Sequence, residues 1–351
     1  MLAGLILALV LAQLAAPQPT APTDNFFDSH GVRIRYVDQG QGPPVILLHG
    51  FTGNLDRRWI APGVFANLAK DHRAIALDCR GHGKSGKPTD PAAYGAEMGQ
   101  DVVRLLDHLK IPRSHIVGFS LGAVILGPLL TTNADRFLTA TFVAHHPEWK
   151  WTNADAEEAE TAAKELEGDT PFRSLILGLS PPDAPRPSDD EVRKFAQGLV
   201  AGNDLKALAA LQRGRRTLVV TEAQLAAVRV PALEIIGSLH PNVEGMKPLK
   251  GIMSALETVV VEGATHGRER GVLRRPEFRT ALREFLDRPR WVRVLREPGH
   301  GFTVSCSPRW NRRERTDARK GARSVRRSAS TASVPRSSWW SSGFLRVCPT
   351  T

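Results

Sequence analysis

The sequence predicts an α/β protein with a mostly parallel central sheet flanked by helices. Short continuous apolar runs at residues 45–48 and 74–77 alternate with longer segments that have helical periodicity. An apolar run without alternation is typical of a strand buried on both faces of a parallel sheet, and strands that alternate with helices favour such a sheet. With 351 residues, of which 42% are hydrophobic, the chain is long enough to bury a large core.

Residues 1–22 are predicted to be a signal peptide followed by a Pro-rich spacer. Residues 1–16 form an apolar run interrupted by Gln13, and this run is too short for a comfortable membrane span. No Lys or Arg precedes the run, which departs from the usual signal-peptide pattern. We expect export to the periplasm, the envelope or the medium, through a cleaved signal peptide or an uncleaved anchor.

Residues 23–290 are predicted to form the folded domain. Alternating residues predict a hairpin at 26–37, with its turn at His30 and Gly31. Two buried strands, an amphipathic helix and a further strand follow in order at 45–48, 74–77, 94–109 and 139–144. Strands at 232–237 and 258–261 and an amphipathic helix at 278–286 complete the domain.

An insertion at about 147–229 interrupts this alternation and is predicted to be a small helical cap. Acidic helical segments at 154–167 and 189–201 flank a Pro-rich stretch at 180–185. Apolar side chains in this region are candidates to line a pocket beneath the cap: Trp149, Trp151, Phe172, Leu175, Ile176 and Leu177. The alternative is that each of them packs within the cap itself.

The basic charge of the chain is concentrated at its C-terminal end. Residues 291–351 carry 13 Lys/Arg against 3 Asp/Glu, whereas the other 290 residues carry 34 against 33, within a total of +11. We expect this tail to be a disordered extension, with contact to an anionic surface as the alternative. The near-neutral folded domain gives no reason to expect a nucleic-acid partner. Cys79, Cys306 and Cys348 form neither a disulfide framework nor a zinc motif, and Cys79 is predicted to be buried.

The segment Gly118-Phe119-Ser120-Leu121-Gly122 follows an apolar strand and precedes an Ala/Leu-rich helix. Strand, sharp turn and helix are the context that a G-x-S-x-G nucleophile elbow requires. Such a turn strains the backbone, so small residues are needed on both sides of it. Ser120 is therefore the candidate nucleophile.

Five separated segments together resemble the α/β-hydrolase fold superfamily, in its branch of esterase-like, haloperoxidase-like and C–C-bond hydrolases. They are the segments 44–51, 78–85, 118–122, 230–237 and 262–267, and they cover roughly residues 25–287. The resemblance implies that His266 is the general base for Ser120. It also implies an oxyanion hole made of the backbone N–H groups of Phe51 and Leu121. Epoxide hydrolases and dehalogenases place Asp where this chain has Ser120.

The resemblance also implies a triad acid in the loop after the penultimate strand, where this chain has His240, 26 residues before His266. A neutral imidazole cannot supply the fixed negative charge that orients the base. Three interpretations remain open. Glu244 in the same loop, or Glu148 after the preceding strand, replaces the acid; His240 accepts the bond in a weaker dyad-like site; or the protein has lost catalysis and kept the fold.

The function expected from these features is cleavage of a small to medium, apolar carboxylic ester through an acyl-enzyme on Ser120. Haloperoxidase-like or C–C-bond hydrolase activity at the same site is the alternative within enzymes. A catalytically impaired binding protein is the alternative outside them. No cofactor or metal is expected, because neighbouring residues such as His145 and His146 point to opposite sides of an extended segment and make a poor metal site with Glu148.

Overall fold

The computed structural model describes residues 22–267 and 269–288. Nearly all of the predicted signal peptide and spacer, and all of the predicted tail with Cys306 and Cys348, lie outside the described residues. The sheet, the cap and the site all belong to a compact unit that ends at Arg283. Among the described residues, no helix combines the length and apolar character needed to cross a membrane.

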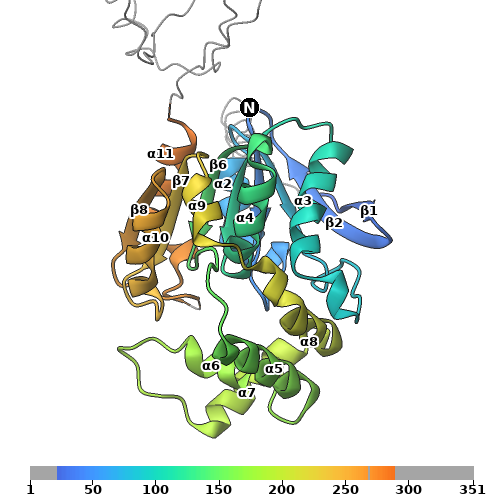
Figure 1. The fold of residues 1–351 in the computed structure, drawn as a ribbon, viewed down its shortest axis with the longest axis vertical. Coiled ribbons are helices and arrows are strands. Elements are labelled where there is room, and N and C mark those ends of the chain that lie inside the picture. The colour runs from blue at the N-terminus through green and yellow to red at the C-terminus, as the bar shows by residue number, and fades with distance from the viewer. Residues whose placement is uncertain (1–21, 268, 289–351) are drawn as a thin grey trace, which may run out of the picture. The chain divides into compact units, whose positions relative to one another are not determined.

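Eight strands form a single sheet in the order β1-β2-β4-β3-β5-β6-β7-β8 (Figure 1). The strands are β1 Asn25–Ser29, β2 Val32–Gln39, β3 Pro44–Leu48, β4 Arg73–Leu77, β5 Ser114–Phe119, β6 Phe137–Val143, β7 Ala232–Gly237 and β8 Leu256–Val261. β2 pairs antiparallel with β1 and with β4, and all pairs from β4 through β8 are parallel. The predicted mostly parallel sheet and its N-terminal hairpin are therefore confirmed.

Helices cover both faces of the sheet. The layer of α3 (Ala96–His108), α4 (Leu121–Thr132), α9 (Glu222–Ala227) and α10 (Met246–Ile252) is continuous, because each of these helices contacts the next (Figure 1). In another layer, α2 (Val64–Leu68) packs on β4 and contacts α11 (Pro276–Leu286), through a hydrogen bond of 3.1 Å from Arg283 to the Asn67 carbonyl. Parallel strands covered in this way need apolar side chains on both faces, which explains the continuous apolar run at β3.

The helical cap lies between β6 and β7. It contains α5 (Asn153–Glu167), α6 (Arg173–Gly178), α7 (Asp189–Val200) and α8 (Leu205–Gly214), which gather below the sheet in Figure 1. Thr152 and Ser188 cap α5 and α7 through reciprocal capping boxes. The chain returns to the sheet before residue 229, because α9 packs against α4.

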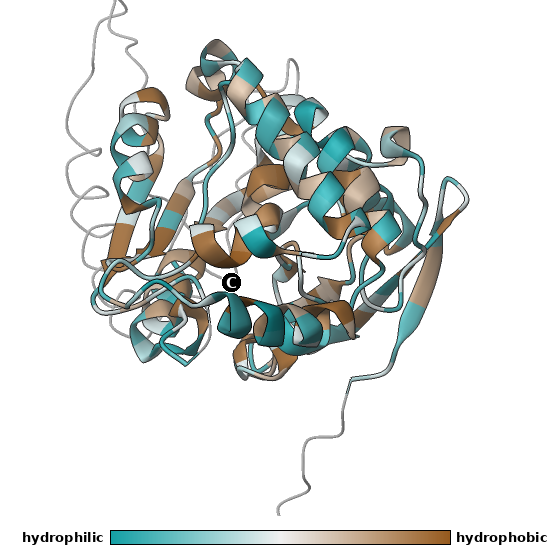
Figure 2. Ribbon diagram, turned by 90° about the horizontal axis from the view of Figure 1, so that it is seen from below, coloured by the Kyte–Doolittle hydropathy of each residue, from teal (hydrophilic) through white to brown (hydrophobic). Residues whose placement is uncertain are grey.

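The core is mostly apolar, and among the described residues the one buried carboxylate without a hydrogen-bond partner is on β7. Figure 2 shows hydrophobic residues along the strands, whereas many outer helical positions are hydrophilic. Cys79 is buried as expected, and burial raises the pKa of its thiol. Glu234 is fully buried in the centre of β7, and neither carboxylate oxygen has a hydrogen-bond partner in the part of the chain that the structure describes. Burial raises the pKa of Glu234 to about 8, so this side chain is a neutral acid at neutral pH.

Candidate active site

Ser120 occupies a strained turn between β5 and α4. Its backbone angles are φ 55° and ψ −116°, which a residue with a β-carbon rarely adopts. The Ser120 N–H donates to the Val143 carbonyl at 2.8 Å, which ties the turn to the neighbouring strand. A β-carbon on Gly118 would lie 2.3 Å from the Gly122 carbonyl oxygen. The turn therefore closes only with glycine at position 118, and it holds the serine side chain at the end of the parallel strands.

The loop after β3 lies directly against Ser120. A β-carbon on Gly50 would lie 2.9 Å from the Ser120 β-carbon, so the next residue, Phe51, begins beside Ser120. Among the described residues, neither the Phe51 N–H nor the Leu121 N–H donates to a backbone or side-chain acceptor. Two unpaired donors near Ser120 fit the predicted oxyanion hole. His82 also holds the loop, because its Nε2 lies 2.5 Å from the Phe51 carbonyl oxygen.

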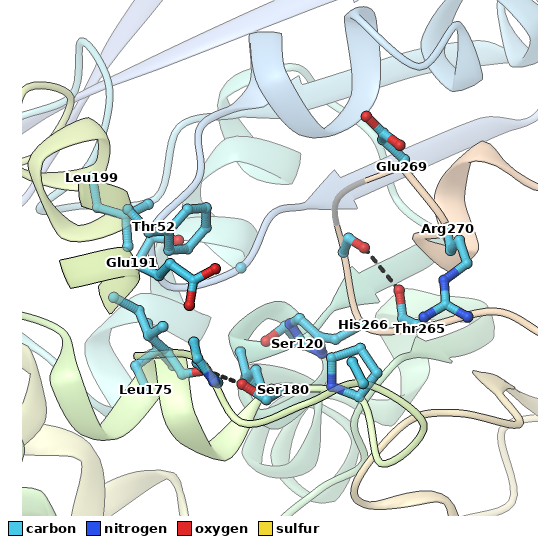
Figure 3. A pocket seen from close by; sticks show the side chains of 18 of the residues that line it. Thr52, Ser120, Leu175, Ser180, Glu191, Leu199, Thr265, His266, Glu269 and Arg270 are labelled. Carbon is cyan, nitrogen blue, oxygen red and sulfur yellow. Dashed lines mark hydrogen bonds between the residues drawn. The ribbon is translucent and has the colours of Figure 1, made fainter. Parts of the chain in front are cut away.

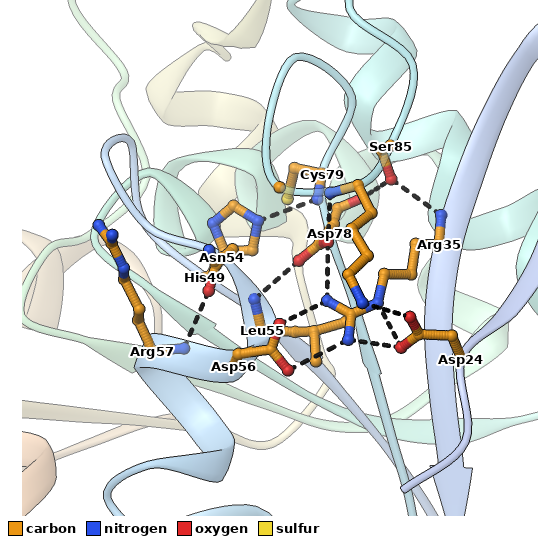
Figure 4. Close-up of polar contacts among 12 residues, drawn as sticks. Asp24, Arg35, His49, Asn54, Leu55, Asp56, Arg57, Asp78, Cys79 and Ser85 are labelled. Carbon is orange, nitrogen blue, oxygen red and sulfur yellow. Dashed lines mark hydrogen bonds and ion pairs between the residues drawn. The ribbon is translucent and has the colours of Figure 1, made fainter. Parts of the chain in front are cut away.

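A buried polar network holds this loop in place (Figure 4). One carboxylate oxygen of Asp78, at the end of β4, accepts the Leu55 N–H at 2.8 Å. The other accepts the Lys84 N–H at 2.9 Å and a bond from Arg35 at 3.1 Å. His49 is fully buried, and its Nε2 accepts the Cys79 N–H at 3.0 Å. Asp78 and His49 therefore position the loop, and among the described residues neither forms a hydrogen bond with Ser120 or His266.

His266 follows β8 and meets His240 from the loop after β7. The distance from His266 Nδ1 to His240 Nε2 is 2.7 Å, and both rings are almost completely buried. The His266 ring also packs on Phe119, the residue before the nucleophile, with 5.1 Å between ring centroids. Ser120 and His266 line the same pocket (Figure 3). The fold therefore brings these distant residues to one site, as the hypothesis of a serine hydrolase requires.

The bonding of His240 determines where the proton on His266 lies. His240 Nδ1 accepts the Asn242 backbone N–H at 2.9 Å, so this nitrogen carries no proton. Neutral His240 therefore carries its proton on Nε2 and donates it to His266 Nδ1. The remaining proton of neutral His266 must then lie on Nε2, whereas a general base for serine needs a free Nε2. We assign the resting pair to this tautomer, which is the reverse of the catalytic one.

The electrostatic surroundings keep both imidazoles neutral. Burial, together with His145 and His146, lowers the pKa of His240 to about 4. Burial, His240 and the positive charge of Arg58 hold the pKa of His266 well below its ordinary range. The backbone carbonyl of Ala144 favours protonation of both rings but does not offset burial. In a serine hydrolase the imidazolium must form during acylation, so surroundings that disfavour a charged imidazole raise the activation barrier of that step.

The two carboxylates considered as substitute acids, Glu244 and Glu148, form ion pairs of their own and do not contact His266 among the described residues. Glu244 pairs with Lys247, and its side chain is 74% exposed. Glu148 accepts a hydrogen bond from Arg215 at 2.6 Å. The residue in contact with His266 Nδ1 is His240 itself, as in the dyad-like interpretation, but in the tautomer assigned above His240 donates this bond and does not accept it.

A pocket of about 1060 Å³ opens above Ser120 and His266. Its apolar wall comes from the cap and includes Leu175, Ile176, Leu179, Phe195 and Leu199. Of the six apolar cap residues named from the sequence, Leu175 and Ile176 line this pocket. Trp151 instead stacks with Arg215, at 5.7 Å from the guanidinium carbon to the ring centroid. The pocket is large enough for a medium-sized ligand.

Two contributors to this site were not recognised in the sequence. The Asn242 backbone N–H fixes the His240 tautomer, and no sequence signal identifies a main-chain donor of this kind. Arg58 lines the pocket and stands two residues after Asp56 in an ordinary polar run. Its position directly before the buried Trp59 is the one signal that could have drawn attention to it. Within the described part of the chain, no group of three or more potential ligands could hold a metal ion.

Comparison with known proteins agrees with this geometry. Residues 43–169 match the family model described as the alpha/beta hydrolase fold. A hydrolase structure from Pseudomonas aeruginosa superposes with a TM-score of 0.63 at 24% identity, covering 77% of this chain and 100% of that one. The chain has the α/β-hydrolase fold. The elements expected for that fold, namely the elbow, the loop after β3 and the late histidine, are therefore all present in this chain.

Curated relatives of this α/β-hydrolase match over part of their length. Epoxide hydrolase A from Mycobacterium tuberculosis is 32% identical over 184 residues, 46% of this chain and 56% of that protein. Esterase YbfF from Escherichia coli is 36% identical over 100 residues, 28% of this chain and 37% of that protein. The chain thus spans between about a third and just over half of the length of these relatives. These likenesses support the fold but do not identify the reaction.

Proposed function

We propose that this α/β-hydrolase cleaves a carboxylic ester through an acyl-enzyme on Ser120. The observation that carries the proposal is the position of Ser120 on a strained turn, in the same pocket as His266 and beside two unpaired backbone donors. Strain of this kind persists where the surrounding structure imposes it, and it clusters at active sites. The resemblance to esterases and the serine at the elbow, in place of aspartate, favour an ester over an epoxide.

In the proposed reaction, Ser120 Oγ attacks the ester carbonyl carbon while its proton passes to His266 Nε2. The Phe51 and Leu121 N–H groups stabilise the oxyanion of the tetrahedral intermediate. The intermediate collapses when the C–O bond to the alcohol breaks and His266 returns the proton to the departing oxygen. Water then attacks the acyl-enzyme by the same route, which releases the acid and restores Ser120.

The first step requires His266 Nε2 to be free of its proton. In the resting tautomer that nitrogen is protonated, so the proton on His266 must first move from Nε2 to Nδ1, while the proton on His240 moves from Nε2 to the Nδ1 of His240 itself. This second transfer breaks the hydrogen bond from the Asn242 N–H. When an amide imposes the wrong tautomer on the histidine of a serine protease, kcat falls by about 10⁴. We therefore expect slow turnover.

A catalytically impaired binding protein is the second candidate, and the reversed tautomer of His266 is the observation that favours it. Both candidates use the same pocket and differ in whether Ser120 reacts. A fluorophosphonate probe distinguishes them, because it forms a covalent bond with an activated serine hydroxyl.

The experiment follows labelling over time in the wild-type protein, in Ser120→Ala and in Ser180→Ala. Ser180 lines the same pocket, but its hydroxyl donates to the Ile176 carbonyl, so it serves as the matched control. Labelling that is lost in Ser120→Ala and kept in Ser180→Ala supports the hydrolase. If folded wild-type protein remains unlabelled after prolonged exposure, the binding protein is the better interpretation.

A further inference from the structure

The pocket contains an arginine for which the fold supplies no counter-ion. Arg58 belongs to the short helix Asp56–Ile60, and its side chain lines the pocket together with Ser120 and His266. Its Nε is buried without a hydrogen-bond partner within residues 22–267 and 269–288. Among the described residues, no carboxylate lies within ion-pair distance of its guanidinium group. The side chain as a whole is half-buried, and a charge that is largely withdrawn from water without a partner is costly, so folded proteins seldom keep one that has no role.

Local packing holds the guanidinium group against the catalytic residues. The Arg58 guanidinium carbon lies 5.0 Å from the centroid of the Phe119 ring, and the same ring packs on His266. A β-carbon on Gly267 would lie 3.8 Å from Arg58 Nη1, which places this nitrogen beside the residue after His266. The cation–π contact with Phe119 is favourable, but it offers no acceptor for the buried Nε.

The charges around Arg58 increase the need for an anion. Arg57 and Arg274 are the charged groups that act on it, and they lower its pKa together with burial. The other arginines of the lining are exposed, and Arg270 is already paired with Asp183 at 2.8 Å. The charged residues of the lining are Arg58, Arg186, Arg270, Arg274, Glu191 and Glu269. Positive charge therefore exceeds negative charge in the pocket, and its most buried part is at Arg58.

We propose that Arg58 is the binding site for a free carboxylate on the substrate, so that the preferred substrate is an ester that also carries a carboxylate group. This proposal rests on the proposed ester hydrolysis for the identity of the ligand. The planar guanidinium group binds a carboxylate through two parallel hydrogen bonds. A bound carboxylate would accept hydrogen bonds from the accessible part of the guanidinium group and neutralise the charge that opposes protonation of His266.

Neutralisation gives the carboxylate a second effect. The positive charge of Arg58 disfavours the imidazolium that forms at His266 in the transition state. A carboxylate paired with Arg58 removes this repulsion, so it assists the reaction in addition to strengthening binding. We therefore expect the preference to appear in kcat as well as in KM.

Two pairs of esters test the proposal and locate the charge. In the first pair, monomethyl adipate carries the carboxylate on its acid part and methyl hexanoate is the neutral counterpart; hydrolysis is followed by acid release. In the second pair, 4-carboxyphenyl butyrate carries the carboxylate on its leaving group and 4-carbamoylphenyl butyrate is the neutral counterpart; hydrolysis is followed by the absorbance of the released phenol. We expect kcat/KM to favour the carboxylate at least tenfold in one pair, as a hydrogen-bonded ion pair predicts. Arg58→Gln should abolish this preference.

Arg57→Gln is the matched control, because Arg57 is the exposed neighbour of Arg58 and does not line the pocket. The preference should remain within about twofold of its wild-type value in this variant. Arg58→Lys keeps the charge but loses the planar guanidinium group, so it should retain part of the preference for the carboxylate. If Arg58→Gln does not fold, Arg58→Lys takes its place in the test. An equal rate for charged and neutral esters in both pairs would overturn the proposal.

Binding of adipate to the Ser120→Ala protein, measured by calorimetry, separates this proposal from the proposed function. If no ester is hydrolysed but adipate binds at least tenfold more tightly than to Ser120→Ala/Arg58→Gln, the carboxylate site stands and the esterase fails. If neutral esters are hydrolysed and adipate does not bind, the esterase stands and the carboxylate site fails.

Discussion

His240 Nε2 lies 2.7 Å from His266 Nδ1, and the Asn242 N–H bonds to the other nitrogen of His240. A histidine thus occupies the position where the superfamily resemblance implies an acid, and it makes the same contact with the base. The contact has the reverse polarity, because His240 donates a proton where a carboxylate would accept one. This relationship determines how the site is expected to respond to substitution and to pH.

Replacing His240 with aspartate should increase ester turnover by about tenfold or more. A carboxylate at position 240 would accept the His266 Nδ1–H, leave Nε2 free and stabilise the imidazolium. The measurement is kcat/KM for a short-chain nitrophenyl ester. His240→Asn is the control, since it has the shape of aspartate without the charge and should remain slow. Equal or lower activity in a folded His240→Asp protein would indicate that the acid comes from elsewhere.

The pH dependence of activity should change in the same variant. Burial and neighbouring cations hold the pKa of His266 well below its usual value, so the wild-type base stays unprotonated in mildly acidic solution. A nearby carboxylate favours the imidazolium and raises this pKa. The acid limb of the kcat/KM profile should therefore lie at higher pH in His240→Asp than in the wild type. Superimposable profiles would show that His266 does not control the acid limb.

Removing the side chain of Ser120 should stabilise the fold while it abolishes fluorophosphonate labelling. Ser120 has a φ of 55°, and glycine adopts such angles without steric cost. We expect Ser120→Gly to increase the free energy of unfolding by about 1 kcal/mol, measured by urea denaturation. Ser120→Ala keeps the β-carbon and should show no comparable gain. A loss of stability in Ser120→Gly would mean that the turn is not strained by the serine.

Glu234 should make stability fall as the pH rises. Its pKa is raised from 4.5 to about 8 in the folded state, so the unfolded chain releases the proton first. Its contribution is fully present below about pH 4.5 and is lost progressively up to about pH 8, by as much as roughly 4 kcal/mol. Glu234→Gln should lose this dependence, which urea denaturation at pH 5 and pH 8.5 would reveal. The same decrease in both proteins would assign the effect to another group.

Much of the fold was predictable from local pattern. The run at β3 has no polar residue to place in water, and it is buried on both faces as predicted. The hairpin turn at His30 and Gly31 and the amphipathic helix α3 were likewise predicted within a few residues of their observed bounds. The return of the chain to the sheet at α9 was not predicted, because an amphipathic helix can pack on a cap or on a sheet with the same sequence pattern.

The sequence by itself determined the nucleophile elbow, since the glycines on both sides of Ser120 are required by the backbone of the turn and are visible as a local motif. It also identified His240 and His266 as residues that belong to the site. Only the tertiary structure decided which nitrogen of His240 carries the proton and which arginine lacks a counter-ion. Both depend on groups brought together from separate loops, the Asn242 amide in one case and the absence of a nearby carboxylate among the described residues in the other. Periodicity and motif spacing report the path of the backbone, whereas the protonation state of a buried group is determined by its neighbours in space.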